Sequence, residues 1–143
     1  MTSNAAHGKN FQKFIYSELC LLGANREIKG VSQNFGVRHP GYSCADQYYA
    51  PFVVTLNSGV RWAIFTTTAC RTDRIKGQQW DAEHIKMLCS DVVRVCLVYP
   101  DETDYREKQA FISQQRKYDT KWEYSCIDKI ECFSEFIKDL KNG

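Results

Sequence analysis

The chain has 143 residues, of which 43% are hydrophobic and 13% aromatic, and its formal net charge is +2. A chain of this length can bury roughly two-thirds of its unfolded surface in one core, so we expect a single domain over residues 1–143, with a mobile tail over residues 1–10. The composition excludes an intrinsically disordered chain, and the small net charge gives no general sign of nucleic-acid binding. The first ten residues lack the apolar run of a signal peptide, and no stretch reaches the roughly 20 apolar residues of a membrane span, so we expect a cytoplasmic protein.

The seven cysteines are odd in number and scattered along the chain. They form no C-x-x-C pair and have no close histidine partner, which favours neither a disulfide framework nor a zinc site. We therefore expect reduced thiols, with Cys96 and Cys20 packed in the core as small apolar residues.

The first half of the chain is expected to form a helix and a hairpin. Apolar residues three and four positions apart predict an amphipathic helix over residues 11–28. The glycines and the proline of residues 30–43 indicate a loop or a short irregular strand. Two β-rich runs, residues 48–56 and 60–70, flank Asn57-Ser58-Gly59, whose Asn and Gly tolerate the positive φ of a hairpin turn.

The second half alternates helices and strands. Residues 78–88 place Trp80, Ile85 and Leu88 at helical intervals, so we expect Trp80 in the core rather than as a stacking platform. The apolar run 92–99 predicts a buried central strand that ends before Pro100. Residues 101–117 suit a surface helix, 121–130 a short strand and 132–140 a terminal helix. This order predicts an α/β fold of the α+β variant, with a mixed β-sheet flanked by helices.

Polar and charged residues crowd the end of the second hairpin strand. On a strand, Thr66 and Thr68 face one side and Thr67 the other, and three cations follow within residues 71–76. Arginine and lysine neutralise phosphate charge, and glutamine can bond bidentately to adenine. The predicted DNA contacts are Thr66, Thr68, Arg71, Arg74, Gln78 and Gln79. The alternative interpretation is a solvated turn whose charges pair among themselves.

The expected elements begin with a helix that bears a glutamate and an aspartate that opens a hairpin. A second strand with a polar end and a further helix follow. This order resembles the PD-(D/E)xK restriction-endonuclease core. The string TTTxxRxDRxKGQQWDA is also similar to a segment of type II restriction enzymes. The likeness covers residues 11–99. In that family, an acid at the start of the hairpin and a second acid, followed two residues later by a lysine, coordinate Mg²⁺ and activate water for phosphodiester hydrolysis. The resemblance therefore implies a restriction endonuclease-like core and cleavage of double-stranded DNA.

The resemblance assigns Asp46 to the first acid and Glu18 to the acid of the opening helix. Thr66-Thr67-Thr68 stand where the family carries Glu-x-Lys, and the nearest acids and lysine lie beyond the strand. Either the catalytic groups have moved onto the following helix or metal chemistry has been lost. In the first case the expected catalytic residues are Glu18, Asp46, Asp73 and Lys76, and the expected Mg²⁺ ligands are Asp46, Asp73 and Asp81.

Each of these residues also has a structural interpretation. Asp46 can form part of a turn before a strand, and Glu18 can be an exposed helix residue. Asp81 can lie in the first turn of its helix, where the helix dipole stabilises a negative charge. His84 is a lone histidine and is more typical of a surface position than of a catalytic base.

We therefore predict a Mg²⁺-dependent endonuclease that acts on double-stranded DNA, as a homodimer because cutting a palindrome suits two-fold symmetry. One alternative is a non-catalytic DNA- or protein-binding module on the same fold. Another is an unrelated α/β protein that binds a small ligand or a partner chain.

Overall fold

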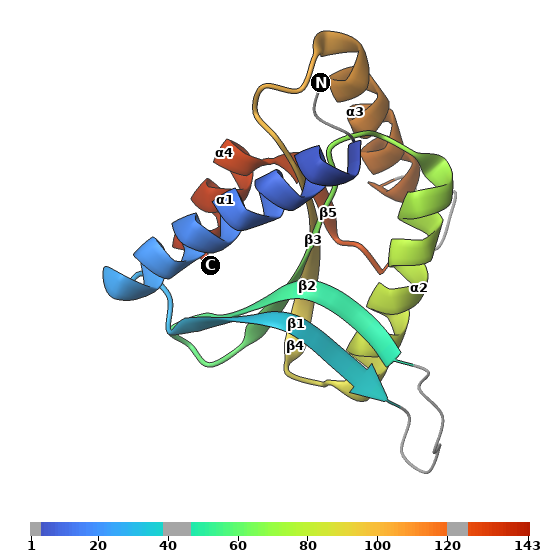
Figure 1. The fold of residues 1–143 in the computed structure, drawn as a ribbon. Coiled ribbons are helices and arrows are strands. Elements are labelled where there is room, and N and C mark those ends of the chain that lie inside the picture. The colour runs from blue at the N-terminus through green and yellow to red at the C-terminus, as the bar shows by residue number, and fades with distance from the viewer. Residues whose placement is uncertain (1–3, 39–46, 120–125) are drawn as a thin grey trace.

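A computed structural model describes residues 4–38, 47–119 and 126–143 of the chain (Figure 1). Four helices and five strands follow one another in these residues. In chain order they are α1 (Asn4–Ala24), β1 (Gly30–Arg38), β2 (Gln47–Thr55), β3 (Arg61–Thr66), α2 (Thr72–Leu88), β4 (Val92–Tyr99), α3 (Tyr105–Asp119), β5 (Lys129–Cys132) and α4 (Phe133–Asn142).

The five strands form one sheet in the order β1-β2-β3-β4-β5. β1 with β2 and β2 with β3 are antiparallel, whereas β3 with β4 and β4 with β5 are parallel. Helices α1 and α4 cover one face of the sheet, and α2 and α3 cover the other (Figure 1). The predicted mixed sheet flanked by helices is therefore confirmed.

Strand β4, the fourth strand of the sheet, lies between two hydrophobic cores. Its Cys96 and Val98 pack toward α1 and α4, while Val95 and Leu97 pack toward α2 and α3. All four side chains are fully buried. A strand covered on both faces needs a nearly continuous apolar run, here unbroken from Val95 to Val98, which is why this strand was identifiable from the sequence.

Several element boundaries differ from the sequence prediction. Residues 30–38 form a nine-residue edge strand where a loop or short irregular strand was expected. β3 ends at Thr66, four residues before the expected end of that run, and α2 begins at Thr72 rather than near residue 78. Helix α1 begins at Asn4, inside the segment expected to be a tail. The last strand is β5 over Lys129–Cys132, nearer to the terminal helix than predicted.

The β1–β2 hairpin changes its buried face halfway along its length. Val31 of β1 packs with α1 and α4, but Phe35, four residues later, packs with α2 and α3. On β2, Phe52 packs with α1 and α4, whereas Ala50, two residues earlier, packs with α2 and α3. Side chains an even number of residues apart on a regular strand share one face, so the alternation is broken in both strands.

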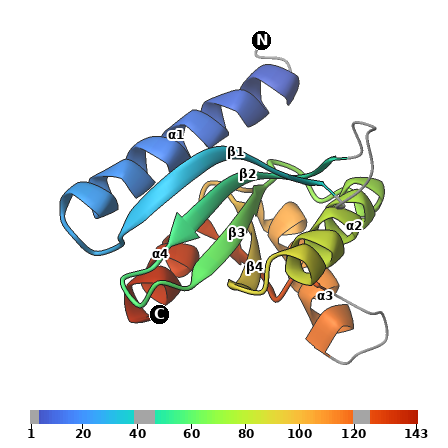
Figure 2. The same ribbon diagram turned by 90° about the horizontal axis from the view of Figure 1, so that it is seen from below.

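The break lies at Asn34 and Pro51. The flanking pairs Gln33 with Phe52 and Phe35 with Ala50 are formed, but these two residues are skipped. Asn34 has a positive φ of 54°, which asparagine tolerates better than most residues, and proline has no N–H for a ladder bond. β3 pairs with β2 only from Phe52 onward. The far half of the hairpin therefore leaves the sheet and lies beside α2 (Figure 2).

Two core predictions have opposite outcomes for the cysteines. Cys96 is buried as expected, but Cys20 is exposed, because it falls on the outer side of α1 from Ile15, Leu19 and Leu22. The six cysteines within the described residues are free thiols, and Cys44 lies outside them. In the same part of the chain, no helix has both the length and the apolar character needed to cross a bilayer.

Candidate functional site

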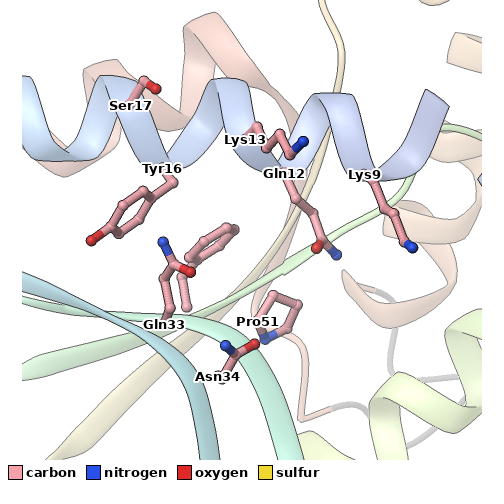
Figure 3. Close-up of a pocket in the computed structure, with 9 residues that line it drawn as sticks. Lys9, Gln12, Lys13, Tyr16, Ser17, Gln33, Asn34 and Pro51 are labelled. Carbon is pink, nitrogen blue, oxygen red and sulfur yellow. The ribbon is translucent and has the colours of Figure 1, made fainter. Parts of the chain in front are cut away.

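A cleft of about 410 Å³ lies between α1 and the β1–β2 hairpin, at the point where the hairpin leaves the sheet. We call it the α1 cleft. Figure 3 shows Gln12 pointing from α1 toward Pro51 of β2, and Gln33 pointing from β1 toward Tyr16. The lining residues are Lys9, Gln12, Lys13, Tyr16, Ser17, Gln33, Asn34, Pro51 and Phe52.

The α1 cleft is basic. Lys9 and Lys13 are exposed and one helical turn apart, and Gln12, Gln33 and Asn34 add neutral amides. None of the described residues that line the cleft is acidic. Ammonium groups and amide N–H groups are donors that suit phosphate oxygens. The arrangement therefore favours an anionic ligand.

Thr66, at the carboxyl end of β3, connects the cleft to α2. Its hydroxyl accepts a hydrogen bond of 3.2 Å from the Gln12 side chain, and its carbonyl accepts one of 3.3 Å from the Gln78 side chain. The Oε1 atom of Gln78 is buried without a hydrogen-bond partner. Ligands of open α/β sheets bind outside the carboxyl ends of the strands, where Thr66 lies. A continuous polar path thus crosses this end of β3 from α1 to α2.

Asp81 lies one helical turn beyond Gln78 on α2. Burial raises its pKa, while a hydrogen bond from the Tyr49 backbone N–H and the nearby His84 act in the opposite direction. Tyr49 follows Asp46 by three residues in the sequence. Asp46 itself lies outside the described residues. The contact nevertheless brings Asp81 to the beginning of β2, the strand that Asp46 precedes.

Asp73 and Lys76 lie on the exposed side of α2. The Asp73 carboxylate is 3.5 Å from the Arg71 guanidinium in an exposed ion pair. Asp73 and Asp81 are eight residues apart, which is about 12 Å along a helix axis. Two carboxylates that share one ion are normally much closer, so Asp73 and Asp81 are not brought together as a ligand pair.

Glu18 is half-buried on α1 and does not line the α1 cleft. The cleft-facing residues of this helix include Gln12, Lys13 and Tyr16, which recur at helical spacing. Glu18 follows Tyr16 by two residues and is therefore rotated by about 200° around the helix. The structure places this acid away from the cleft.

The other predicted DNA contacts occupy different environments. β3 ends at Thr66, and the Thr67 hydroxyl donates a 2.7 Å hydrogen bond to the Ala69 carbonyl, so the strand geometry that would align Thr66 with Thr68 does not continue. The Gln79 side-chain oxygen accepts hydrogen bonds from the N–H groups of Cys126 and Ile127, at 2.7 and 3.1 Å. Arg71 and Arg74 are exposed at the start of α2.

Mg²⁺ requires oxygen ligands, usually with at least one carboxylate. Within the described ranges, no three histidine, cysteine or acidic side chains gather into a group that could hold a metal ion.

The cleft residues of α1 were not identified from the sequence. Lys9 lies in the segment taken as a tail, and Lys13 looks like an ordinary solvent-facing position. The available signal was the polar recurrence of Lys9, Gln12, Lys13 and Tyr16 at intervals of three and four residues. No protein-family model matches this chain, and no similar curated protein or solved structure was found for it.

Proposed function

We propose that the protein binds double-stranded DNA, with backbone phosphates held in the α1 cleft by Lys9 and Lys13. The observation that carries this proposal is the pairing of two exposed lysines with the amides of Gln12 and Asn34, among described lining residues that include no acid. Such a site attracts phosphate without metal, because the cations replace the condensed counterions of the nucleic acid.

The start of α2 supplies further cations on the other side of Thr66. Arg71, Arg74 and Lys76 are exposed there. The Gln78 side chain on the same helix donates a hydrogen bond to the Thr66 carbonyl. The order of helix, antiparallel strands, helix and parallel strand is compatible with the restriction endonuclease-like core that the sequence resembles. We infer that DNA crosses the carboxyl end of β3 between α1 and α2.

The proposal is tested by fluorescence anisotropy with a labelled DNA duplex of mixed sequence over a range of salt concentrations. Lys9→Ala with Lys13→Ala is expected to weaken binding by about tenfold or more at low salt. It should also reduce the slope of log K against log salt by about two, since each phosphate contact contributes about 0.9. The matched control is Lys29→Ala with Lys138→Ala, which removes two exposed lysines outside the cleft.

The control pair should bind the duplex almost like the unchanged protein. Equal weakening by both pairs would show that binding follows net charge alone, and no weakening by the Lys9 and Lys13 pair would remove the cleft from the proposal. Circular dichroism spectra and unfolding midpoints of all variants should match, since the four side chains are exposed.

Mg²⁺-dependent hydrolysis of the bound DNA is a second candidate function, favoured by the contact between Asp81 and the Tyr49 N–H. Asp81 and Asp46 would hold the ion, with Lys76 expected to place the attacking water. When bound, Mg²⁺ supplies charge stabilisation at the phosphoryl group. Cleavage of both strands of a palindrome further implies a homodimer, which sedimentation equilibrium would detect.

Incubation of a mixed-sequence plasmid with Mg²⁺, Mn²⁺ or EDTA tests the hydrolysis. Discrete fragments that require metal are the expected result for a site-specific nuclease, and Asp46→Asn and Asp81→Asn should abolish them while leaving duplex binding intact. Asparagine keeps an oxygen that can accept the hydrogen bond from Tyr49. Intact plasmid in every lane would contradict hydrolysis and leave the binding function as the proposal.

A further inference from the structure

Three aromatic rings lie in contact between α2 and the beginning of β2, and we call them the aromatic stack. The rings of Tyr48 and His84 are stacked with centroids 3.9 Å apart and planes inclined by 13°. The Trp80 ring lies on the His84 ring at 4.4 Å, inclined by 48°. The His84 Nδ1 atom lies 2.8 Å from the Trp80 carbonyl oxygen, which fixes the histidine ring within its own helix.

Trp80, the outermost ring of this stack, is 58% exposed, contrary to the expectation that it packs in the core. The buried positions of α2 are Ile75, Ala82 and Ile85, which share one side of the helix and leave Trp80 on the other. Tryptophan usually buries much of its large apolar surface, so a half-exposed indole with a supported ring is a suitable surface for a flat ligand. Its neighbours hold it without covering it.

The chemistry around Trp80 indicates which ligand that would be. Lys76 lies one turn earlier on the same exposed side of α2, so that a cation accompanies the ring. Asp81, the next residue, lies one turn beyond Gln78 of the polar path and accepts a hydrogen bond from the backbone N–H of Tyr49, beside Tyr48. Trp80 of the aromatic stack therefore lies on the same helix as Gln78, within one turn of the proposed DNA site. An aromatic ring with a neighbouring cation suits a nucleobase and its phosphate.

We propose that the exposed face of Trp80 stacks with one unpaired base of a nucleic-acid strand, while Lys76 contacts the adjoining phosphate. Tyr48 and His84 position the indole and are not themselves contacts to the base. The inference rests on the proposed DNA binding and deepens it, because it extends the ligand class from the duplex to strands with an unpaired base.

The test compares Trp80→Ala, Trp80→Phe and the control Met87→Ala, each titrated with a ten-nucleotide thymidine oligomer and with a fully paired duplex. Met87 is 63% exposed on the same side of α2 and carries no ring. Trp80→Ala should weaken oligomer binding by roughly 5- to 100-fold, the range that follows from losing one base stack. Trp80→Phe should recover most of that loss, and Met87→Ala should change neither affinity.

Duplex affinity should change by less than about twofold in all three variants, since a paired base is not available for stacking. The oligomer should quench tryptophan fluorescence in the unchanged protein and much less in Trp80→Phe, and an oligomer of abasic sites should lose the dependence on Trp80. Oligomer affinity that is equal in Trp80→Ala and the unchanged protein would overturn the proposal. So would a shift from dimer to monomer in Trp80→Ala at unchanged oligomer affinity, because a second copy of the chain would then cover the indole.

The two proposals fail separately. If the Lys9 and Lys13 pair has no effect on the duplex while quenching by the oligomer still requires Trp80, the α1 cleft is refuted and the stacking site stands. If the cleft variants lose duplex binding and Trp80→Ala binds the oligomer normally, the reverse holds.

Discussion

The side-chain amide of Gln12 on α1 donates a 3.2 Å hydrogen bond to the hydroxyl of Thr66 at the end of β3. The two residues are 54 positions apart, and Thr66 is only 9% exposed. A buried hydroxyl needs a partner, and here the partner belongs to the α1 cleft. The bond therefore couples the position of α1, one wall of the cleft, to the carboxyl end of β3.

This coupling is measurable with a double-mutant cycle of Gln12→Ala and Thr66→Val. Each single change should destabilise the protein, and the coupling free energy should be about 0.5–1.5 kcal/mol, as for a neutral hydrogen bond. Urea unfolding of the four proteins provides the free energies of unfolding. Strict additivity would mean that the bond contributes nothing to the folded state.

The positive φ of Asn34 predicts a graded series of substitutions at that residue. Asn34→Gly should be the mildest change, Asn34→Ala intermediate and Asn34→Val the most harmful, at about 1–3 kcal/mol, because a β-branched residue resists this conformation. The Asn34 oxygen also accepts a hydrogen bond from the Tyr49 hydroxyl, which all three changes remove. Differences within the series thus report the backbone alone.

The matched control is Ser32→Val, at an exposed residue of the same strand with ordinary geometry. Valine favours strands, so this change should be neutral or stabilising. Thermal unfolding midpoints give the order, and a series in which valine is tolerated at residue 34 as well as glycine would contradict a required left-handed backbone.

The change of buried face within the β1–β2 hairpin explains why β1 was not predicted from the sequence. A half-buried strand is recognised by alternating apolar residues, but Val31 and Phe35 pack against opposite helix layers. The period of two is therefore interrupted at Asn34. By contrast, β4 was predicted with its observed bounds, because burial on both faces makes every residue from Val95 to Val98 apolar.

The site was predicted less completely than the fold. The cations after β3 were visible as a cluster in the sequence. Lys9 and Lys13 become part of a cleft only because α1 lies over the β1–β2 hairpin, and no local sequence pattern predicts this long-range contact. Trp80 was misassigned because the predicted helix began at residue 78. The true start at Thr72 adds the buried Ile75, which fixes the helix face toward the core.

Gln79 is predicted to act through stability rather than through DNA contact. Its side-chain oxygen is shared by the N–H groups of Cys126 and Ile127, residues that are buried beside β5. Gln79→Ala leaves both donors without this acceptor, so the free energy of unfolding should fall by about 1–3 kcal/mol. The exposed Gln109→Ala in α3 should change it by less than about 0.5 kcal/mol. Duplex affinity measured well below the unfolding midpoint should be unaffected, and a selective loss of affinity in a stable Gln79→Ala protein would contradict this assignment.

Glu131 of β5 is the buried member of a partly exposed cluster of charges between the sheet and α4. It is 4% exposed, and its carboxylate oxygens lie 3.8 Å from the Arg94 guanidinium and 3.9 Å from the Lys129 ammonium. The pKa of Glu131 is raised to about 8, chiefly by burial and also by the Asp139 carboxylate, and the two cations only partly offset this increase. The folded protein therefore holds a proton on this side chain in the neutral range.

This raised pKa predicts that stability decreases as the pH increases from about 4.5 to about 8, because the folded state keeps a proton that the unfolded state releases. The contribution is fully present below the unfolded pKa and is lost as the pH passes the folded value. Asp139, whose pKa Glu131 lowers, contributes in the opposite sense but only as the pH falls below its ordinary value of 3.8, outside this window.

Glu131→Gln cannot titrate, so its unfolding midpoint should vary less between these pH values and should exceed that of the unchanged protein near pH 8. Glu135→Gln, at an exposed residue of α4, serves as the control and should retain the original pH profile. Parallel profiles for Glu131→Gln and the unchanged protein would show that this carboxyl does not carry the proton.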